Sequence, residues 1–153
     1  MKAPARGAIG GAAFLLAAAC VLALLAASAE AQSETPGSSK RFADALGQAP
    51  EKARARHSPV EQEQDAVAAG GKLFELHCAE CHGRKASGTR RGPSLLGEEM
   101  QQAPPGAIFW VLTNGVVRHG MPVWSKLPEP ERWQLVTFLK SFRAQTASKE
   151  GAL

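Results

Sequence analysis

The chain is short of cysteine and of strand-forming patterns, and each shortage excludes a class of protein. It contains three cysteines and four histidines in 153 residues. A structural zinc site uses four ligands, but no second Cys or His pair at finger spacing accompanies Cys78 and Cys81. A thioredoxin-like motif belongs in a βαβ unit, for which the sequence has no strand pattern. The length, without any internal repeat, favours one small domain with accessory segments.

The N-terminal segment has no charge over residues 7–29 and ends in small residues before Glu30. Because two basic residues precede it, such a run is typical of an export signal, which we place over 1–31. Cleavage is expected before Glu30 or before Gln32, where small residues occupy the required positions. The run is also long enough to cross a bilayer, so an uncleaved N-terminal anchor is the alternative.

Composition and helix signals divide the rest of the chain into three segments. Residues 32–57 are rich in small, polar and charged residues, which predicts a flexible linker in which a short helix over 42–46 could form. Residues 58–145 form the expected domain, and 146–153 are expected to be a disordered tail. Ser58 is expected to cap the first helix of the domain, which would run towards residue 76.

The domain is predicted to be all-α. Its last helix includes residues 133–142, where apolar residues repeat at helical spacing, and a shorter helix is expected over about 105–114. Gly70 and Gly71 lie inside the first helix, where a glycine costs about 1 kcal/mol relative to alanine. Close approach of a second helix would explain this pair.

The segment Cys78-Ala79-Glu80-Cys81-His82 indicates a specific chemistry. A disulfide between its two cysteines would close a tiny loop and constrain little. The pattern is typical of covalent haem attachment, in which the two thiols add across the vinyl groups of the porphyrin and His82 becomes an axial ligand of the iron. Export supports this interpretation, because bacteria attach haem covalently on the outer side of the membrane.

Three residues are candidates for the opposite axial position: Met100, His119 and Met121. A thioether is the usual ligand for electron transfer. Met121 lies 39 positions after His82 in a Gly-Met-Pro turn, in which glycine would let the backbone come close and proline would stiffen the segment. That length lets the chain return on the other face of the macrocycle. Met100 is expected to be an ordinary surface or packing residue, and His119 to point to solvent.

Together these motifs resemble a class I cytochrome c domain over about residues 64–143. The matching residues are Gly70 and Phe74 ahead of the Cys-x-x-Cys-His segment, then Gly92, Pro93, Ser94 and Leu95, the Gly-Met-Pro turn, and Leu135, Phe138 and Leu139. The resemblance implies three to five short helices wrapped around one covalent haem c. It also implies that the carbonyl of Pro93 accepts a hydrogen bond from His82, and that Gly70 and Phe74 cross the last helix at Leu135 and Phe138.

Other residues are expected near the haem. Trp124 could hydrogen-bond a haem propionate through its indole N–H, or it could cover the porphyrin edge. Arg118 could pair with a propionate or stay in solvent. The apolar surroundings of the ring are expected to include Leu95, Leu96, Phe109 and Trp110.

A haem of this kind predicts single-electron transfer rather than enzyme catalysis. The main hypothesis is a periplasmic or membrane-tethered electron carrier, and the alternative is the cytochrome subunit of a periplasmic dehydrogenase or terminal oxidase complex. A haem catalyst or gas sensor would need an open sixth position. Redox proteins are the expected partners and nucleic acid is not; membrane contact is expected only if the N-terminal segment is retained.

Four basic residues follow the haem-attachment motif: Arg84, Lys85, Arg90 and Arg91. They lie beside the expected exposed edge of the porphyrin. They could attract an acidic redox partner over long range, or they could form a solvated basic loop.

Intact-mass measurement of the exported, haem-loaded protein tests the N-terminal prediction. We expect a soluble mature chain that begins at Glu30 or Gln32, because these positions follow the two small-x-small sequences. Recovery of Met1 to Ala29 in a membrane fraction would show instead that the segment is an anchor.

Overall fold

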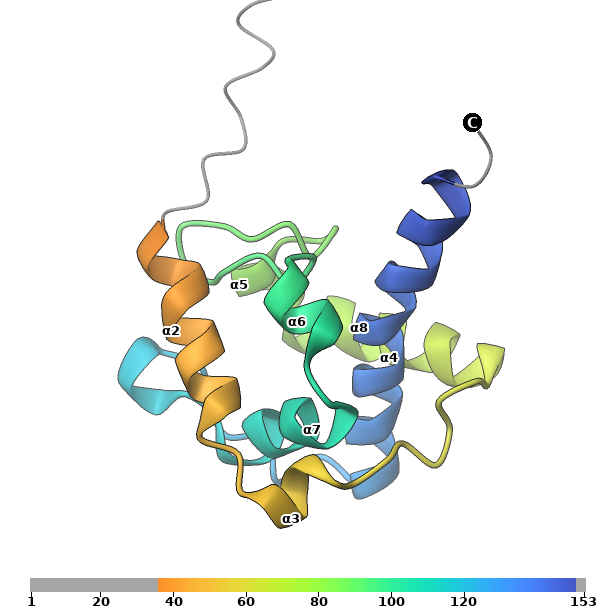
Figure 1. Cartoon of the computed structure of the whole chain (residues 1–153), viewed down its shortest axis with the longest axis horizontal. Coiled ribbons are helices and arrows are strands. Elements are labelled where there is room, and N and C mark those ends of the chain that lie inside the picture. The colour runs from red at the N-terminus through yellow and green to blue at the C-terminus, as the bar shows by residue number, and fades with distance from the viewer. Residues whose placement is uncertain (1–35, 151–153) are drawn as a thin grey trace, which may run out of the picture. The chain divides into compact units, whose positions relative to one another are not determined.

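The computed structural model describes the backbone of residues 36–150 and the side chains of residues 40–143. In this part of the chain the elements are α2 (Pro36–Gly47), α3 (Glu51–Arg54), α4 (Gln64–His77), α5 (Ala79–His82), α6 (Glu98–Gln102), α7 (Pro105–Asn114), a 3-10 turn η1 (Val117–His119) and α8 (Glu129–Glu150). Figure 1 shows their arrangement. The expected export signal over 1–31 lies outside the described residues.

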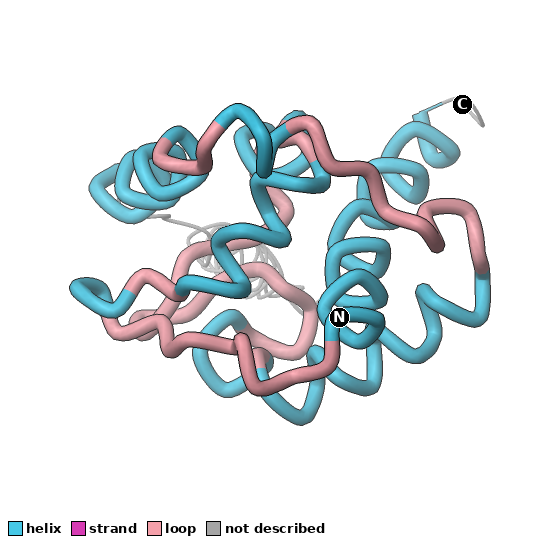
Figure 2. The backbone as a smooth tube through the Cα atoms, turned by 90° about the horizontal axis from the view of Figure 1, so that it is seen from below, coloured by secondary structure: helices cyan, strands magenta, loops and turns pink. Residues whose placement is uncertain are grey.

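The all-α prediction is confirmed. Residues 36–150 contain no strand (Figure 2), and their one β-like feature is an isolated bridge between Val116 and Met121. Five helices, α4 to α8, begin within the predicted domain over 58–145, which agrees with the three to five that the resemblance implied, and α2 and α3 precede that domain. No described helix combines the length and the apolar character that a membrane span requires.

Helices α4 and α8 cross at Gly70. A Cβ atom on Gly70 would lie 2.1 Å from the backbone oxygen of Gln134 and 2.8 Å from the Cβ of Phe138. Phe74, one turn further along α4, is buried, and its ring centroid lies 5.4 Å from that of Phe138. The missing side chain lets the two backbones approach, which offsets the cost of about 1 kcal/mol for glycine in a helix. The predicted crossing of the two helices is confirmed at Phe138, with Gln134 as the other contact of Gly70, and so is the reason for Gly70.

Helix α4 begins later than predicted, and Ser58 does not cap it. Residues 59–62 form turns, and α4 begins at Gln64. The buried hydroxyl of Ser58 accepts a hydrogen bond from the backbone N–H of Val60 at 3.3 Å and lies 3.1 Å from the hydroxyl of Thr137 on α8. A buried hydroxyl needs a hydrogen-bond partner. For Ser58 that partner is Thr137 of α8 and not the N-terminus of α4.

The prediction of a flexible linker over 32–57 is wrong for the part that the structure describes. Helix α2 buries Ala45 and Leu46 in the core, and α3 packs against α7. The contact with α7 is close at Gly106, where a Cβ atom would lie 2.0 Å from the carbonyl oxygen of Ala53. Composition misled the prediction because a short helix with few apolar residues can still bury them on one face.

The two C-terminal helices agree with the prediction except at the end of α8. Helix α7 spans the expected residues and ends at Asn114, with Gly115 as its C-cap. Helix α8 has Pro130 in its first turn, where the missing N–H of proline leaves no hydrogen-bond partner unsatisfied. The backbone of α8 continues through residues 146–150. The predicted disordered tail is therefore wrong for these five positions, and residues 151–153 lie outside the described part of the chain.

Replacing Gly70 with alanine should lower the thermal unfolding midpoint of the haem-loaded protein. The added methyl group would overlap the α8 backbone, and overpacking costs about 1–3 kcal/mol or more, which exceeds the gain in helix propensity. Gly47→Ala is the matched control, because nothing lies within 4 Å of its added atom. The control should keep or slightly raise the midpoint. Equal midpoints for the two variants would contradict the close crossing.

Candidate haem site

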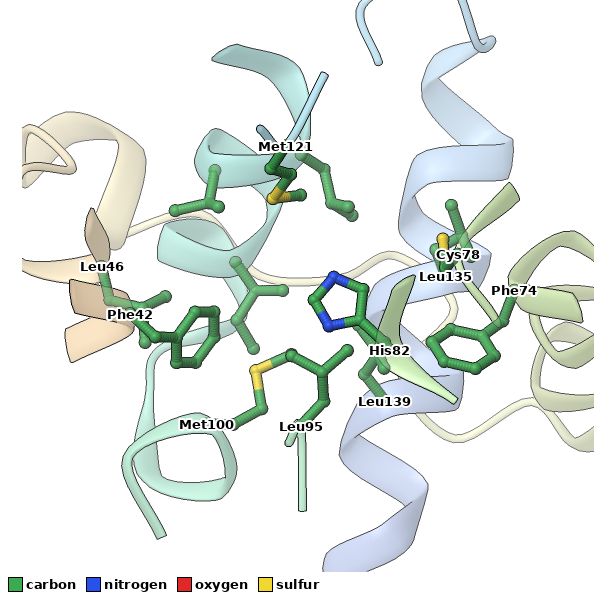
Figure 3. Close-up of a pocket in the computed structure, with 13 residues that line it drawn as sticks. Phe42, Leu46, Phe74, Cys78, His82, Leu95, Met100, Met121, Leu135 and Leu139 are labelled. Carbon is green, nitrogen blue, oxygen red and sulfur yellow. The ribbon is translucent and has the colours of Figure 1, made fainter. Parts of the chain in front are cut away.

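An apolar pocket lies among the helices, and its empty space of about 440 Å³ includes a part that is open to solvent. Apart from the imidazole of His82, the side chains that line it are hydrocarbon or sulfur-containing. Figure 3 draws all of them: Phe42, Leu46, Phe74, Cys78, His82, Leu95, Met100, Ile108, Val111, Leu112, Met121, Leu135 and Leu139. A concave apolar pocket with few polar groups is typical of a cofactor site.

One hydrogen bond fixes the imidazole of His82. Its Nδ1 lies 2.9 Å from the carbonyl oxygen of Pro93. Because that oxygen can only accept, Nδ1 carries the proton and donates, which leaves the lone pair of Nε2 for a metal. Burial lowers the pKa of His82 below its ordinary value, and the hydrogen bond to Pro93 opposes this in part. The ring is therefore neutral at neutral pH, the form that binds iron.

The loop after His82 holds the Pro93 carbonyl against the ring. The backbone N–H of Gly88 donates to the carbonyl of His82 at 2.8 Å, so the chain folds back on α5. On the return, a Cβ atom on Gly92 would lie 3.0 Å from the carbonyl oxygen of Cys81 and 3.2 Å from Cε1 of His82. Glycine at position 92 thus lets the loop lie directly on the imidazole.

Cys78 and Cys81 lie within one helical turn and are both free thiols. The carbonyl of Cys78 accepts hydrogen bonds from the backbone N–H groups of Cys81 and His82, at 3.1 and 2.9 Å. Cys78 lines the pocket, and both thiols are half-buried. Burial, with a smaller contribution from Cys81, raises the pKa of the Cys78 thiol to about 11. The free side chain is therefore an uncharged thiol, as an apolar pocket requires.

Met121 follows a tight turn after α7. Its backbone pairs with Val116 through two hydrogen bonds, of 3.0 and 3.3 Å. Gly120 has a φ of 83°, in the left-handed region that favours glycine. A Cβ atom there would meet nothing within 4 Å, so the expectation that Gly120 permits a close approach is wrong. The close approach is at Gly115, where a Cβ atom would lie 2.7 Å from the carbonyl oxygen of Pro122.

Both candidate methionines reach the pocket, and the candidate histidine does not line it. Figure 3 shows the sulfur atoms of Met121 and Met100 and the imidazole of His82 pointing into the same space. Met100 was expected to be either a surface residue or a packing residue. It is buried, so it is a packing residue. His119 is exposed on η1, as predicted.

Comparison with known proteins agrees with this geometry. The family model described as "Cytochrome C oxidase, cbb3-type, subunit III" matches residues 65–139. That segment is a class I c-type cytochrome domain. The Cbb3-type cytochrome c oxidase subunit FixP of Sinorhizobium medicae (strain WSM419) is 32% identical to this chain over 82 residues, which cover 47% of this chain and 28% of that protein. The chain thus matches little more than a quarter of the length of this curated relative.

A solved structure shares the fold of the cytochrome c domain. Cytochrome CL of the marine methylotrophic bacterium Methylophaga aminisulfidivorans superposes with a TM-score of 0.51 and 20% sequence identity, covering 74% of this chain and 71% of that one. At this identity the likeness concerns the fold alone.

The pocket fits the haem c that cytochrome c domains bind covalently. The thiol of Cys78, a neutral imidazole with Nε2 available and the thioethers of Met121 and Met100 line one apolar space. The second free thiol, Cys81, lies within one helical turn of Cys78. This donor set is the one that c-type haem iron and its vinyl groups require. When bound, the haem supplies one-electron chemistry, and the chain supplies its attachment, orientation and dry surroundings.

Two residues predicted to contact the haem, Trp124 and Arg118, do not line the pocket. The ring of Trp124 is half-buried, 5.2 Å from the ring of His77, and its backbone N–H donates to the carbonyl of Leu112 at 3.0 Å. Arg118 is exposed on η1. A role for either residue towards a propionate stays a prediction.

The predicted apolar wall is correct in part. Leu95 lines the pocket, whereas Leu96 is 42% exposed. Phe109 turns away and stacks on Trp133, with ring centroids 4.2 Å apart. Helix α7 instead presents Ile108, Val111 and Leu112 to the pocket. Phe109 is buried as expected, but neither Phe109 nor Trp110 lines the pocket, because aromatic character does not reveal which face of an apolar helix meets the cofactor.

Sequence reasoning also missed two pocket residues that precede the predicted domain. Phe42 and Leu46 of α2 line the pocket although they belong to the segment predicted as a linker. Their i, i+4 spacing was the available signal, since it places both side chains on one face of a helix.

Proposed function

We propose that this protein transfers single electrons outside the cytoplasm, through one haem c attached to Cys78 and Cys81 and ligated by His82 and Met121. The observation that carries the proposal is the convergence of His82, Met121 and Cys78 on one apolar pocket, with Cys81 one helical turn from Cys78. Neither a general base nor a nucleophile is required, so the protein is proposed to be a carrier rather than an enzyme in itself.

The residues of the chain would support electron transfer because they hold the iron ligands in one orientation and limit the rearrangement that accompanies a change of charge. The Pro93 carbonyl holds the imidazole of His82 in one orientation and one tautomer, which also raises the basicity of Nε2. The apolar lining excludes water, so that little solvent reorganises when the charge of the site changes. A thioether ligand favours the reduced state and closes the sixth position to small molecules.

The place of action follows from the N-terminal segment. The uncharged run over 7–29 predicts export, and covalent haem attachment in bacteria requires it. A periplasmic location is therefore proposed, with tethering to the membrane if the segment is retained.

A second candidate function is that of a cytochrome subunit within an oxidase complex. The matching family model and the relative from Sinorhizobium medicae both carry the words cbb3-type cytochrome c oxidase subunit. Purification from native membranes under mild detergent would distinguish the two, because a subunit would co-purify with oxidase components and a free carrier would not.

Replacing Met121 with alanine tests the proposed sixth ligand. The variant should lose the weak far-red sulfur-to-iron charge-transfer band, bind carbon monoxide in the ferrous state and show a lower reduction potential, because the thioether that favours ferrous iron is gone. The haem should stay attached, since the thioether bonds of Cys78 and Cys81 are untouched. Absorption spectra, carbon monoxide titration and potentiometry measure these effects.

Met100→Ala is the matched control, because Met100 is the other methionine in the lining. It should keep the charge-transfer band and the resistance to carbon monoxide. If the wild-type ferrous protein already binds carbon monoxide readily, or if the band disappears with Met100 and not with Met121, the ligand assignment is wrong. A haem sensor or catalyst would then be favoured in the first case.

The basic loop after the haem motif is proposed to guide an acidic redox partner, but its charge is partly compensated. Arg84 pairs with Glu75, and Arg91 pairs with Glu80, in exposed ion pairs. Lys85 and Arg90 are also exposed in this loop. Exposed pairs contribute little to stability, so the guanidinium groups can be redirected towards a partner.

Electron-transfer rates with an acidic redox protein should fall as salt rises, because the Debye length is only about 10 Å at 0.1 M salt. Stopped-flow measurement from low to high ionic strength checks this. Replacing Lys85 and Arg90 with alanine should weaken the dependence of the rate on ionic strength. Lys52→Ala, which replaces an exposed lysine on α3, should change this dependence less. A wild-type rate that ignores salt would contradict electrostatic guidance.

A further inference from the structure

Helix α2 supplies part of the pocket although it precedes the segment that matches the family model. Phe42 and Leu46 line the pocket, and the family match begins at residue 65. Figure 3 shows the two side chains on the side of the pocket opposite Phe74, with the imidazole of His82 between. Leu46 is buried and Phe42 half-buried, so both are packed against the core.

A second set of contacts fastens the segment that carries α2. The guanidinium of Arg56 lies over the ring of Phe109 at 4.5 Å and over the ring of Trp133 at 5.1 Å, and it pairs with Glu129. Cation–π contacts of this kind contribute about 0.5–1 kcal/mol each when exposed and more when desolvated. This cluster ties the chain just after α3 to both α7 and α8.

Two further contacts connect α2, α3 and α7. The side chain of Arg54 donates a hydrogen bond to the carbonyl of Leu46 at 3.2 Å. Gly106 of α7 leaves room for the carbonyl of Ala53, which a Cβ atom would approach to 2.0 Å. Residues 36–57 are therefore a fastened part of the fold, with one end against the pocket and the other against α7 and α8.

We propose that residues 36–57 form a haem strap, in which Phe42 and Leu46 contact the porphyrin and keep water from it. This inference rests on the proposed function, since it takes the pocket as the haem site. Neither residue has a polar atom in its side chain, so their contribution is apolar cover and not ligation. The strap thereby sets the polarity around the ring.

The chemical consequence is a higher reduction potential. Oxidised haem ligated by a neutral imidazole and a thioether carries one more positive charge than the reduced form, and apolar surroundings disfavour the more charged state. Cover by Phe42 and Leu46 therefore favours ferrous iron. Exposing this side of the ring to water would stabilise the ferric form.

Nuclear Overhauser effects in the reduced, diamagnetic wild-type protein test the contact without any substitution. Protons of the Phe42 ring and of the Leu46 methyl groups should show cross-peaks to protons of the haem. Their absence, in a protein whose Leu95 or Leu139 protons do show such cross-peaks, would overturn the proposal.

Substitutions test the effect on the iron. Phe42→Ala combined with Leu46→Ala should lower the reduction potential while Met121 stays bound, as the charge-transfer band would report. Phe42→Leu keeps apolar volume and should recover most of the wild-type potential. Gly47→Ala is a neutral control on the same helix with open space around its added atom, and it should change nothing. A wild-type potential in the double variant would contradict the strap.

Failure of the strap and failure of the proposed function give different results. If the charge-transfer band is present and the iron cycles reversibly, but the cross-peaks and the potential shift are absent, the strap alone is wrong. If the haem is attached without methionine ligation, the axial assignment is wrong, while the cross-peaks still report whether α2 covers the ring. If the double variant loses its haem, the cross-peaks of the wild-type protein still show whether Phe42 and Leu46 contact the porphyrin.

Discussion

The crossing of α4 and α8 at Gly70 is the contact on which the rest of the site depends. A side chain at this position would overlap the backbone of α8, so the two helices keep this distance only because glycine has none. Helix α4 ends at His77, directly before Cys78, and therefore the crossing places the haem-attachment segment. Helix α8 lines the same pocket with Leu135 and Leu139. One backbone contact thus positions two sides of the haem pocket.

The pocket must hold a polar iron ligand in apolar surroundings. An iron ligand must be polar, yet a polar group in an apolar pocket is costly unless its other donors and acceptors are satisfied. His82 meets both demands, because its Nδ1–H donates to the carbonyl of Pro93 and its half-buried ring is neutral. The other donor atoms are sulfur atoms, whose weak hydrogen bonding makes them inexpensive to bury. The site is therefore suited to a cofactor whose charge changes by one unit with little movement of the protein.

The N-terminal helices change the boundary of the domain. The family match begins at residue 65, but α2 and α3 pack on the core through Leu46, Ala53 and the Arg56 cluster. In a domain that must enclose a large flat cofactor, a short added helix can complete an apolar surface that the remaining chain leaves incomplete. The pocket therefore draws on a wider part of the chain than the family match alone.

The amino-acid sequence determined the chemistry and much of the fold. Three of its patterns are local, because each requirement imposes a residue type at a fixed position. Covalent attachment requires the Cys-x-x-Cys-His segment, and backbone clearance requires the glycine pair in α4. A positive φ requires the glycine of the Gly-Met-Pro turn. Tertiary structure alone decided what depends on faces and distances: that Ser58 pairs with Thr137 rather than capping α4, that α7 turns Ile108 and not Phe109 to the pocket, and that Phe42 belongs to the site. Each of these outcomes requires the position of a partner distant in sequence, and packing free energy then exceeds local propensity.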